Sequence, residues 1–229
     1  MPSLVTQKYN EWTEGLDTHQ SMISIFYHIR DIPYSLAAPV RDSLSAPEQL
    51  LRIGKGSCGP KHHLLAEMYR RLNLNVAYAT IAFSWNDPDL LYPPELRELV
   101  TSVPVSHHLA CRVQIGGRWV LVDATWDPPL ARAGFPVNEH WDGWADTKCA
   151  VKALRSPVRT AFCRTLTNEP CRTNEEAGLS PLDGEKDHRD AEDQIRYHAE
   201  KVAVRTPDDR ERSSRFAREF EAWLERVRS

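Results

Sequence analysis

The stretch from Gly54 to Lys61 constrains this chain most, because it joins a glycine-rich turn to a helix around a single cysteine. Three glycines and a proline within these eight residues rule out one regular element. Apolar side chains then recur at helical spacing: Leu64, Leu65, Met68 and Leu72. Since Pro60 suits a first helical turn, the pattern predicts a helix that begins at or just after Cys58.

A cysteine at the start of a helix has an unusual electrostatic environment. The Cys58 thiol would lie among unpaired N–H groups at the positive end of the helix dipole, which lowers a thiol pKa. Lys61, about one turn further on, would add a nearby positive charge, although a solvated lysine is the simpler expectation. The alternative is that Cys58 is a small buried hydrophobe, as most free cysteines are.

Composition and charge narrow the class of protein. The 229 residues are enough for one sizeable core plus an appendage, and 41% hydrophobic with 27% charged residues is ordinary for a globular protein. A net charge of −3 gives no general attraction to nucleic acid or to an anionic membrane. Because the chain lacks a membrane-spanning apolar run and a signal core at Met1–Asn10, we expect a cytoplasmic protein.

The cysteine and histidine patterns argue against a disulfide framework and a metal site. The chain has five cysteines, an odd number without a close CxxC pair: Cys58, Cys111, Cys149, Cys163 and Cys171. The adjacent histidines at 62–63 and 107–108 would point apart on either a helix or a strand. We therefore expect neither a metal nor another cofactor.

The chain divides into three parts. We expect a core domain over residues 1–160, a polar linker over 161–184, and a charged, helical extension over 185–229. The extension ends in an apolar stripe at helical spacing: Phe216, Phe220, Trp223, Leu224 and Val227. This stripe should dock on the core, although it could instead bind a partner or lie over the functional site. Within the core, helices are expected over Asp17–Arg30 and Ala46–Ile53, and a strand over Val76–Phe83.

Two strand-like runs, His107–Ile115 and Arg118–Thr125, flank Gly116-Gly117, a strong signal for a two-residue hairpin. In that register Ile115 opposes Arg118, Val113 opposes Val120 and Ala110 opposes Asp123. One face is then apolar and should meet the core. The other face carries His108 and Asp123 as diagonal neighbours, roughly 5–8 Å apart between Cβ atoms, while His107 points the opposite way.

Cys58, His108 and Asp123 together match the requirements of thiol catalysis. A thiolate attacks a carbonyl, an imidazole moves the proton, and a carboxylate fixes the imidazole tautomer. Taken singly, His108 could be a surface histidine and Asp123 a cap for the corner at residues 123–125. Their order along the chain, and the placement of His108 and Asp123 on one face of the hairpin, favour a catalytic role for the three together.

These residues resemble the transglutaminase-like superfamily of papain-like thiol enzymes. The resemblance rests on Gly56-x-Cys58 with the helix that follows, on His108 at a strand start, and on the run Trp119–Thr125; the segment Ile25–Tyr34 resembles that family's entry helix. It implies an α+β fold in which the cysteine helix packs on an antiparallel sheet bearing the histidine and the aspartate. Ala110, where the family often has an aromatic residue, is a departure.

The resemblance implies a cysteine hydrolase or acyltransferase acting on a peptide, a protein or a small amide or acyl substrate, with hydrolysis the simpler expectation. For the oxyanion, the Cys58 N–H is the natural first donor, and the candidates for a second are Gln49, Ser57 and Trp85. The alternative is a non-catalytic binding or scaffold protein that keeps the fold. Neither nucleic acid nor membrane is an expected partner.

Overall fold

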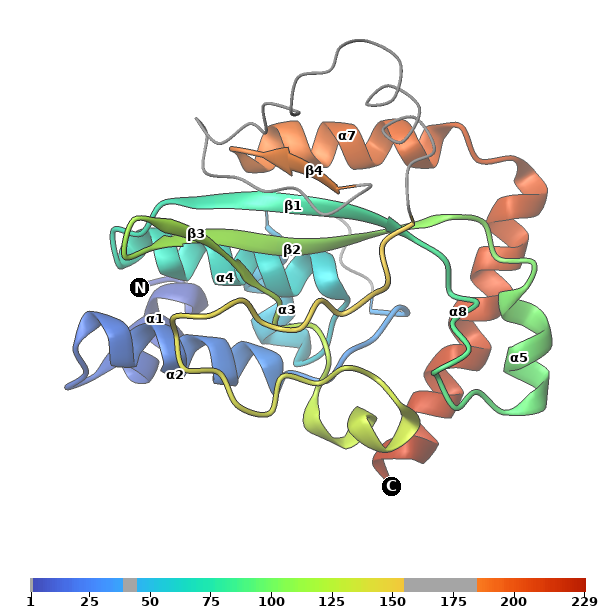
Figure 1. Cartoon of the computed structure of the whole chain (residues 1–229), viewed down its shortest axis with the longest axis horizontal. Coiled ribbons are helices and arrows are strands. Elements are labelled where there is room, and N and C mark those ends of the chain that lie inside the picture. The colour runs from blue at the N-terminus through green and yellow to red at the C-terminus, as the bar shows by residue number, and fades with distance from the viewer. Residues whose placement is uncertain (1, 39–44, 155–184) are drawn as a thin grey trace, which may run out of the picture.

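The computed structural model describes residues 2–38, 45–154 and 185–229, and within them the fold is α+β (Figure 1). A four-stranded antiparallel sheet in the order β3-β2-β1-β4 is flanked by helices. The strands are β1 (Val76–Phe83), β2 (Ser106–Ile115), β3 (Arg118–Val122) and β4 (Glu185–His188). The helices are α1 (Leu4–Thr13), α2 (Thr18–Arg30), α3 (Ala46–Ile53), α4 (Cys58–Arg71), α5 (Pro94–Val100), α7 (Ala191–Ala203) and α8 (Pro207–Arg228), with a 3₁₀ helix η1 (Pro128–Ala133).

The predicted helices and first strand of the core are confirmed. α2 starts with a capping box in which Asp17 and Gln20 bond each other's backbone N–H groups, which fixes its first turn. α3 ends at Gly54, whose φ of 77° is a left-handed conformation that glycine adopts without strain. That turn releases the chain into the cysteine loop, and α4 begins at Cys58.

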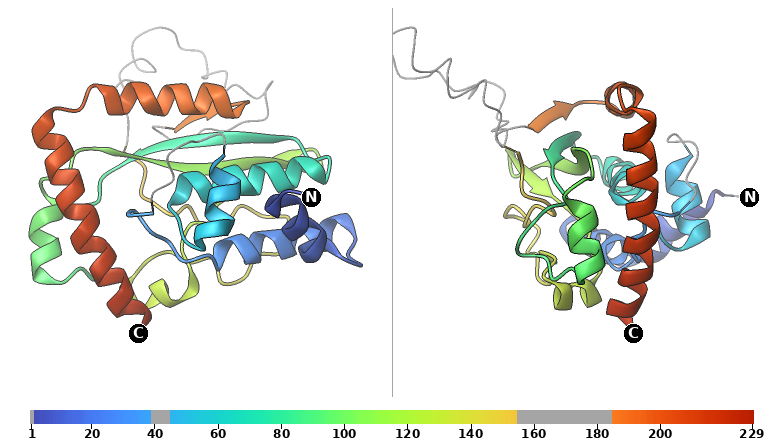
Figure 2. Two further views of the ribbon diagram at one scale, coloured as in Figure 1. Left: turned by 180° about the vertical axis from the view of Figure 1, so that it is seen from behind. Right: turned by 90° about the vertical axis from the view of Figure 1, so that its right-hand side faces the viewer.

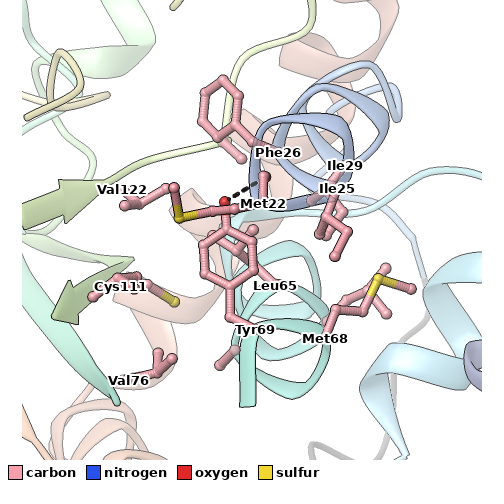
Figure 3. Packing of buried hydrophobic residues seen from close by; sticks show 14 of the residues in the cluster. Met22, Ile25, Phe26, Ile29, Leu65, Met68, Tyr69, Val76, Cys111 and Val122 are labelled. Carbon is pink, nitrogen blue, oxygen red and sulfur yellow. Dashed lines mark hydrogen bonds between the residues drawn. The ribbon is translucent and has the colours of Figure 1, made fainter. Parts of the chain in front are cut away.

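The main hydrophobic core fixes α4 between α2 and the sheet (Figure 3). Tyr69 of α4 is fully buried, and its hydroxyl donates to the Met22 carbonyl of α2 over 2.9 Å, the dashed line in Figure 3. Val122 of β3 and Cys111 of β2 approach the same ring from the sheet side. Because this packing holds α4 against β2, it also sets where Cys58 lies relative to β2.

The hairpin of β2 and β3 has the predicted register, with Val113 opposite Val120 and Ile115 opposite Arg118. β3 ends at Val122, however, and does not extend to Thr125. At that point the Asp123 N–H donates to Thr147 Oγ1 over 2.9 Å, and the same segment also bonds the outer edge of β3 at Leu121. Asp123 therefore leaves the sheet just after its last pair.

The expectation that the tail is helical from Glu185 is wrong for its first four residues. They form β4, which pairs antiparallel with β1. Charged residues on an edge strand hide the usual strand pattern. Here Glu185 is buried against Arg112 of β2, whose guanidinium donates to both carboxylate oxygens over 2.8–2.9 Å. That bidentate pair stabilises a strand that composition does not favour.

The last helix, α8, packs its apolar stripe against a second cluster of buried side chains. Figure 2 shows α8 crossing the end of the sheet, with α5 beside it. Phe216, Phe220, Trp223 and Leu224 are buried in this largely aromatic cluster, which also contains Trp85, Tyr92, Trp126 and Phe135. The expected linker at 161–184 lies outside the described residues, so the domain boundaries at 160 and 185 stay a prediction.

None of the helices in the described ranges combines the length and the apolarity that crossing a bilayer would need.

Candidate active site

Cys58 is the first residue of α4. The loop that precedes it is held in place by the segment that follows α2, through Pro33 and Ser35. The Gly56 N–H donates to the Pro33 carbonyl, and the Ser35 N–H donates to the Gly56 carbonyl, each over 3.1 Å. A Cβ at Gly56 would lie 2.6 Å from Cδ1 of buried Leu50, so glycine alone fits without repacking. Residues far apart in the sequence therefore fix the backbone that presents the thiol.

His108 lies between Cys58 and Asp123. Its Nε2 is 2.8 Å from Asp123 Oδ2, and its side chain is hydrogen-bonded to the Cys58 thiol. Since Nε2 faces the carboxylate, Nδ1 is the ring nitrogen that faces the sulfur. His108 is 2% exposed, so the surface-histidine alternative is wrong. The structure thus brings the three residues together.

The Asp123 carboxylate accepts four hydrogen bonds. Oδ1 accepts from the Thr125 hydroxyl at 2.6 Å and the Thr125 N–H at 3.2 Å, and Oδ2 accepts from His108 and from the Ala150 N–H at 2.7 Å. The side chain therefore caps the corner at residues 123–125 and orients the imidazole as well. The sequence offered these two roles of Asp123, corner cap and partner of the imidazole, as alternatives, and the structure shows both contacts.

The electrostatics of these three groups favour a thiolate beside an imidazolium. Burial raises the pKa of Cys58, but the hydrogen bond and the charge of His108 outweigh it and lower that pKa. Burial lowers the pKa of His108, and the charge and hydrogen bond of Asp123 raise it well above its ordinary value. Burial opposes ionisation of Asp123, yet His108 keeps the pKa of that carboxyl low. By contrast, burial raises the pKa of Cys149 to about 11.

Lys61 is fully buried, which contradicts the expectation of a solvated lysine. Its Nζ donates to the carbonyls of Arg30 (3.0 Å), Ile32 (2.8 Å) and Thr125 (2.6 Å). Burial lowers its pKa to about 7, against the attraction of nearby carboxylates. The burial of Lys61 could have been predicted from the sequence, because Lys61 precedes Leu65 by four residues and so lies on the same, buried face of the helix.

His62 ties the cysteine to the segment that follows Asp123. Nδ1 donates to the Cys58 carbonyl over 2.9 Å, and Nε2 accepts from the Ala124 N–H over 3.0 Å, which fixes a neutral tautomer. Burial lowers its pKa to about 4, in agreement with that tautomer. In the sequence, the adjacent pair His62-His63 suggests at most a metal ligand and gives no sign of this role. No group of three or more His, Cys, Asp or Glu in the described ranges is placed to hold a metal.

Cys58 and His108 open onto a cleft of about 470 Å³. Trp126 and Val151 line it on the core side, and residues of α7 line it on the other. The N-terminus of α4, the start of β2 and the C-terminal part of the chain therefore enclose one space. A substrate in it would meet the thiol directly.

The three candidates for a second oxyanion donor lie in different places. Ser57 and Trp85 line the cleft, but the Trp85 indole N–H donates to Ser106 Oγ over 3.1 Å. The Gln49 amide donates to Ser45 Oγ over 2.5 Å, and Gln49 is not among the described residues that line the cleft. Of the three, Ser57 is the N-cap residue next to the thiol.

Comparisons with known proteins add little. No family model matches the chain, and no curated protein matches it in sequence. Among solved structures, a crystal structure from Cytophaga hutchinsonii described as a “Putative Cysteine Protease” is similar at a TM-score of 0.38 with 21% identity. The match covers 56% of this chain and 38% of that one. A TM-score this low does not establish a shared fold, so any function rests on this chain's own residues.

Proposed function

We propose that this protein is a thiol enzyme that cleaves or transfers an acyl group from an amide through an acyl-enzyme. Cys58 is the nucleophile, His108 the acid and base, and Asp123 the orienting carboxylate. One observation carries the proposal: a half-buried thiol at a helix start, opening on a cleft, hydrogen-bonded to an imidazole that lies 2.8 Å from a buried carboxylate. The α+β arrangement, with α4 against an antiparallel sheet, supports a transglutaminase-like core.

The chemistry follows from which atoms face one another. The Cys58 thiolate attacks the carbonyl carbon, and as the C–S bond forms the π electrons move onto oxygen, beside the Cys58 N–H. As the C–N bond breaks, imidazolium Nδ1–H of His108 donates its proton to the leaving amine. Water, or an acceptor amine, then attacks the acyl-enzyme while His108 takes its proton, and the C–S bond breaks to return the thiolate. Asp123 stays ionised throughout.

Hydrolysis is the simpler outcome, with a peptide, a protein or a small amide as substrate. In the alternative, the chain is a non-catalytic binding protein that keeps the fold. A binding protein has no use for a thiol of lowered pKa, so thiol reactivity separates the two.

The decisive experiment is iodoacetamide alkylation of each cysteine as a function of pH, read by peptide mass spectrometry, for wild type and His108→Ala. We expect Cys58 to react at about pH 6.5, roughly two units below a free thiol's pKa, and to lose that advantage in the variant. Cys111 and Cys149 are internal controls, because burial raises the pKa of each. If Cys58 follows a free thiol's pH profile and ignores the mutation, the enzyme proposal fails.

A positive result leads to the reaction itself. A panel of amide and ester substrates is then tested, with Cys58→Ala expected to abolish turnover and acyl-enzyme formation detected as a mass increase on the peptide containing residue 58. Added amines that raise product release over water would identify a transferase.

A further inference from the structure

α7 forms one wall of the cleft that holds the thiol. Gln194, Ile195, His198 and Val202 of α7 line it opposite Cys58 and His108, and Arg205 lines it just beyond the helix. Figures 1 and 2 show α7 running beside β4 along the edge of the sheet. Gln194 also hydrogen-bonds His63 of α4, so the wall is joined to the helix that carries the nucleophile.

Apart from the proposed thiolate–imidazolium pair, the permanently charged side chain in the described lining of this cleft is the guanidinium of Arg205. The described lining contains no Asp or Glu, whereas the basic side chains are His63, His107, His108, His198 and Arg205. The proposed thiolate and imidazolium neutralise each other, and burial keeps His63 and His107 neutral, so the positive charge of Arg205 is uncompensated within the described lining. Because acidic residues outnumber Lys and Arg in the whole chain, 32 to 29, this bias is local to the cleft.

Three of these basic groups gather at the α7 side, next to the start of β2. Arg205 donates to the Val105 carbonyl over 3.2 Å, which holds its guanidinium beside that strand. Burial first, and then the nearby charges of His198, Lys201 and Arg205, lower the pKa of His107 to about 4. Burial and then Arg205 lower the pKa of His198 as well. Such mutual effects require the groups to lie close together.

We propose that the α7 side of this cleft binds an anionic group of the substrate, a carboxylate near the acyl group that Cys58 attacks, so that the substrate is an acidic amide or peptide. This inference rests on the proposed function. Arg205 supplies a permanent charge and planar N–H donors that fit a carboxylate. His107 and His198 can donate further N–H groups. A cationic substrate would meet repulsion here with no carboxylate in the described lining to offset it.

The test compares alkylation of Cys58 by iodoacetate and by iodoacetamide, which share a leaving group and a size but differ in charge. The rate ratio at Cys58 is divided by the same ratio for glutathione. The His108 imidazolium itself favours an anion, so the decisive comparison is between variants that keep His108. We expect Arg205→Gln to lower the normalised ratio about two- to five-fold, as for a solvent-accessible ion pair. The double variant with His198→Leu, which also removes an N–H donor, should lower it further.

Arg118→Gln is the matched control, because it removes the same charge from the hairpin turn at the far end of β2 and should leave the ratio unchanged. High salt should reduce the wild-type ratio toward that of Arg205→Gln. Thermal unfolding confirms that each variant is folded.

The inference is overturned if Arg205→Gln and the double variant keep the wild-type ratio. Its failure is distinct from failure of the proposed function. If Cys58 reacts rapidly with iodoacetamide but Arg205→Gln leaves the ratio unchanged, only the proposal of an anionic substrate fails. If Cys58 reacts with iodoacetamide no faster than a free thiol does, the enzyme proposal fails, whatever the ratio.

Discussion

Asp123 illustrates how much one residue can do in this molecule. Its carboxylate accepts from Thr125, Ala150 and His108, so it closes a corner of the backbone and aims the imidazole at the same time. A rigidly held carboxylate stabilises the imidazolium without moving when the proton is transferred. A substitution that removes the charge of Asp123 but keeps its size should therefore lower the reactivity of the Cys58 thiol.

Asp123→Asn should reduce alkylation of Cys58 at about pH 6.5 by at least roughly tenfold, because an uncharged amide no longer raises the pKa of His108. The measurement is the second-order rate with iodoacetamide across pH. Asp208→Asn, at an exposed position in the first turn of α8, is the matched control. An unchanged pH profile in Asp123→Asn would show that this carboxylate does not control the imidazole.

Lys61→Met should destabilise the fold by about 2–4 kcal/mol, because it leaves the carbonyls of Arg30, Ile32 and Thr125 without their donor. Urea unfolding gives the free energy. Lys8→Met, at a lysine whose partner Glu11 is exposed, should change it by less than about 1 kcal/mol. Equal effects of the two substitutions would contradict a special role for the buried ammonium.

Among the secondary-structure elements, α8 contributes most to the second core cluster. Phe220 is fully buried and contacts the rings of Trp85, Phe135 and Trp223. At the end of the helix, Arg228 forms two bonds to the Asp127 carboxylate over 2.8–2.9 Å. The last helix is thereby fastened to the loop that follows the proposed catalytic carboxylate.

Phe220→Ala should cost about 3–5 kcal/mol of unfolding free energy, as a large cavity replaces a buried ring. Glu219→Ala, at the exposed neighbouring position, should cost little. Chemical denaturation measures both. If Phe220→Ala is as stable as Glu219→Ala, α8 is not docked on the core in solution.

Across the whole molecule, neutral histidines that are buried or half-buried link folding to pH. His62, His63 and His107 each have a pKa lowered to about 4, by burial first. Below the ordinary histidine pKa of about 6.5 the unfolded chain binds these protons and the folded protein does not, so stability falls as pH drops from about 6.5 toward 4. Above that window all three are neutral in both states. His108 is protonated in both states inside it and adds no slope.

His62→Gln should therefore flatten the decline of unfolding free energy across this window by up to about 1.4 kcal/mol per pH unit. Glutamine keeps a donor for the Cys58 carbonyl and an acceptor for the Ala124 N–H, but it cannot take up a proton. The groups facing His62 are Asp123, whose Oδ1 is 3.6 Å from Nε2, and the His108 ring. Urea unfolding at several pH values measures the slope, and identical slopes for wild type and variant would refute the prediction.

Local pattern was enough for the elements that carry the proposed site. Helical spacing and Pro60 determined that α4 starts at Cys58, and the Gly116-Gly117 turn with one apolar face determined the register of β2 and β3. These features are local because turn chemistry and side-chain period act over a few residues. The facing of His108 and Asp123 follows from that register.

Contacts between residues distant in sequence follow from no local pattern. β4 forms because Glu185 meets Arg112, and no local signal in a charged stretch marks that pairing. Lys61 is buried because three carbonyls from two distant segments converge on it. The α7 wall of the cleft likewise depends on where the sheet edge places that helix. Local sequence pattern therefore identifies the candidate site residues and the elements that carry them. Long-range packing sets their further hydrogen-bond partners and the shape of the cleft, because such contacts leave no short-range periodicity in the sequence.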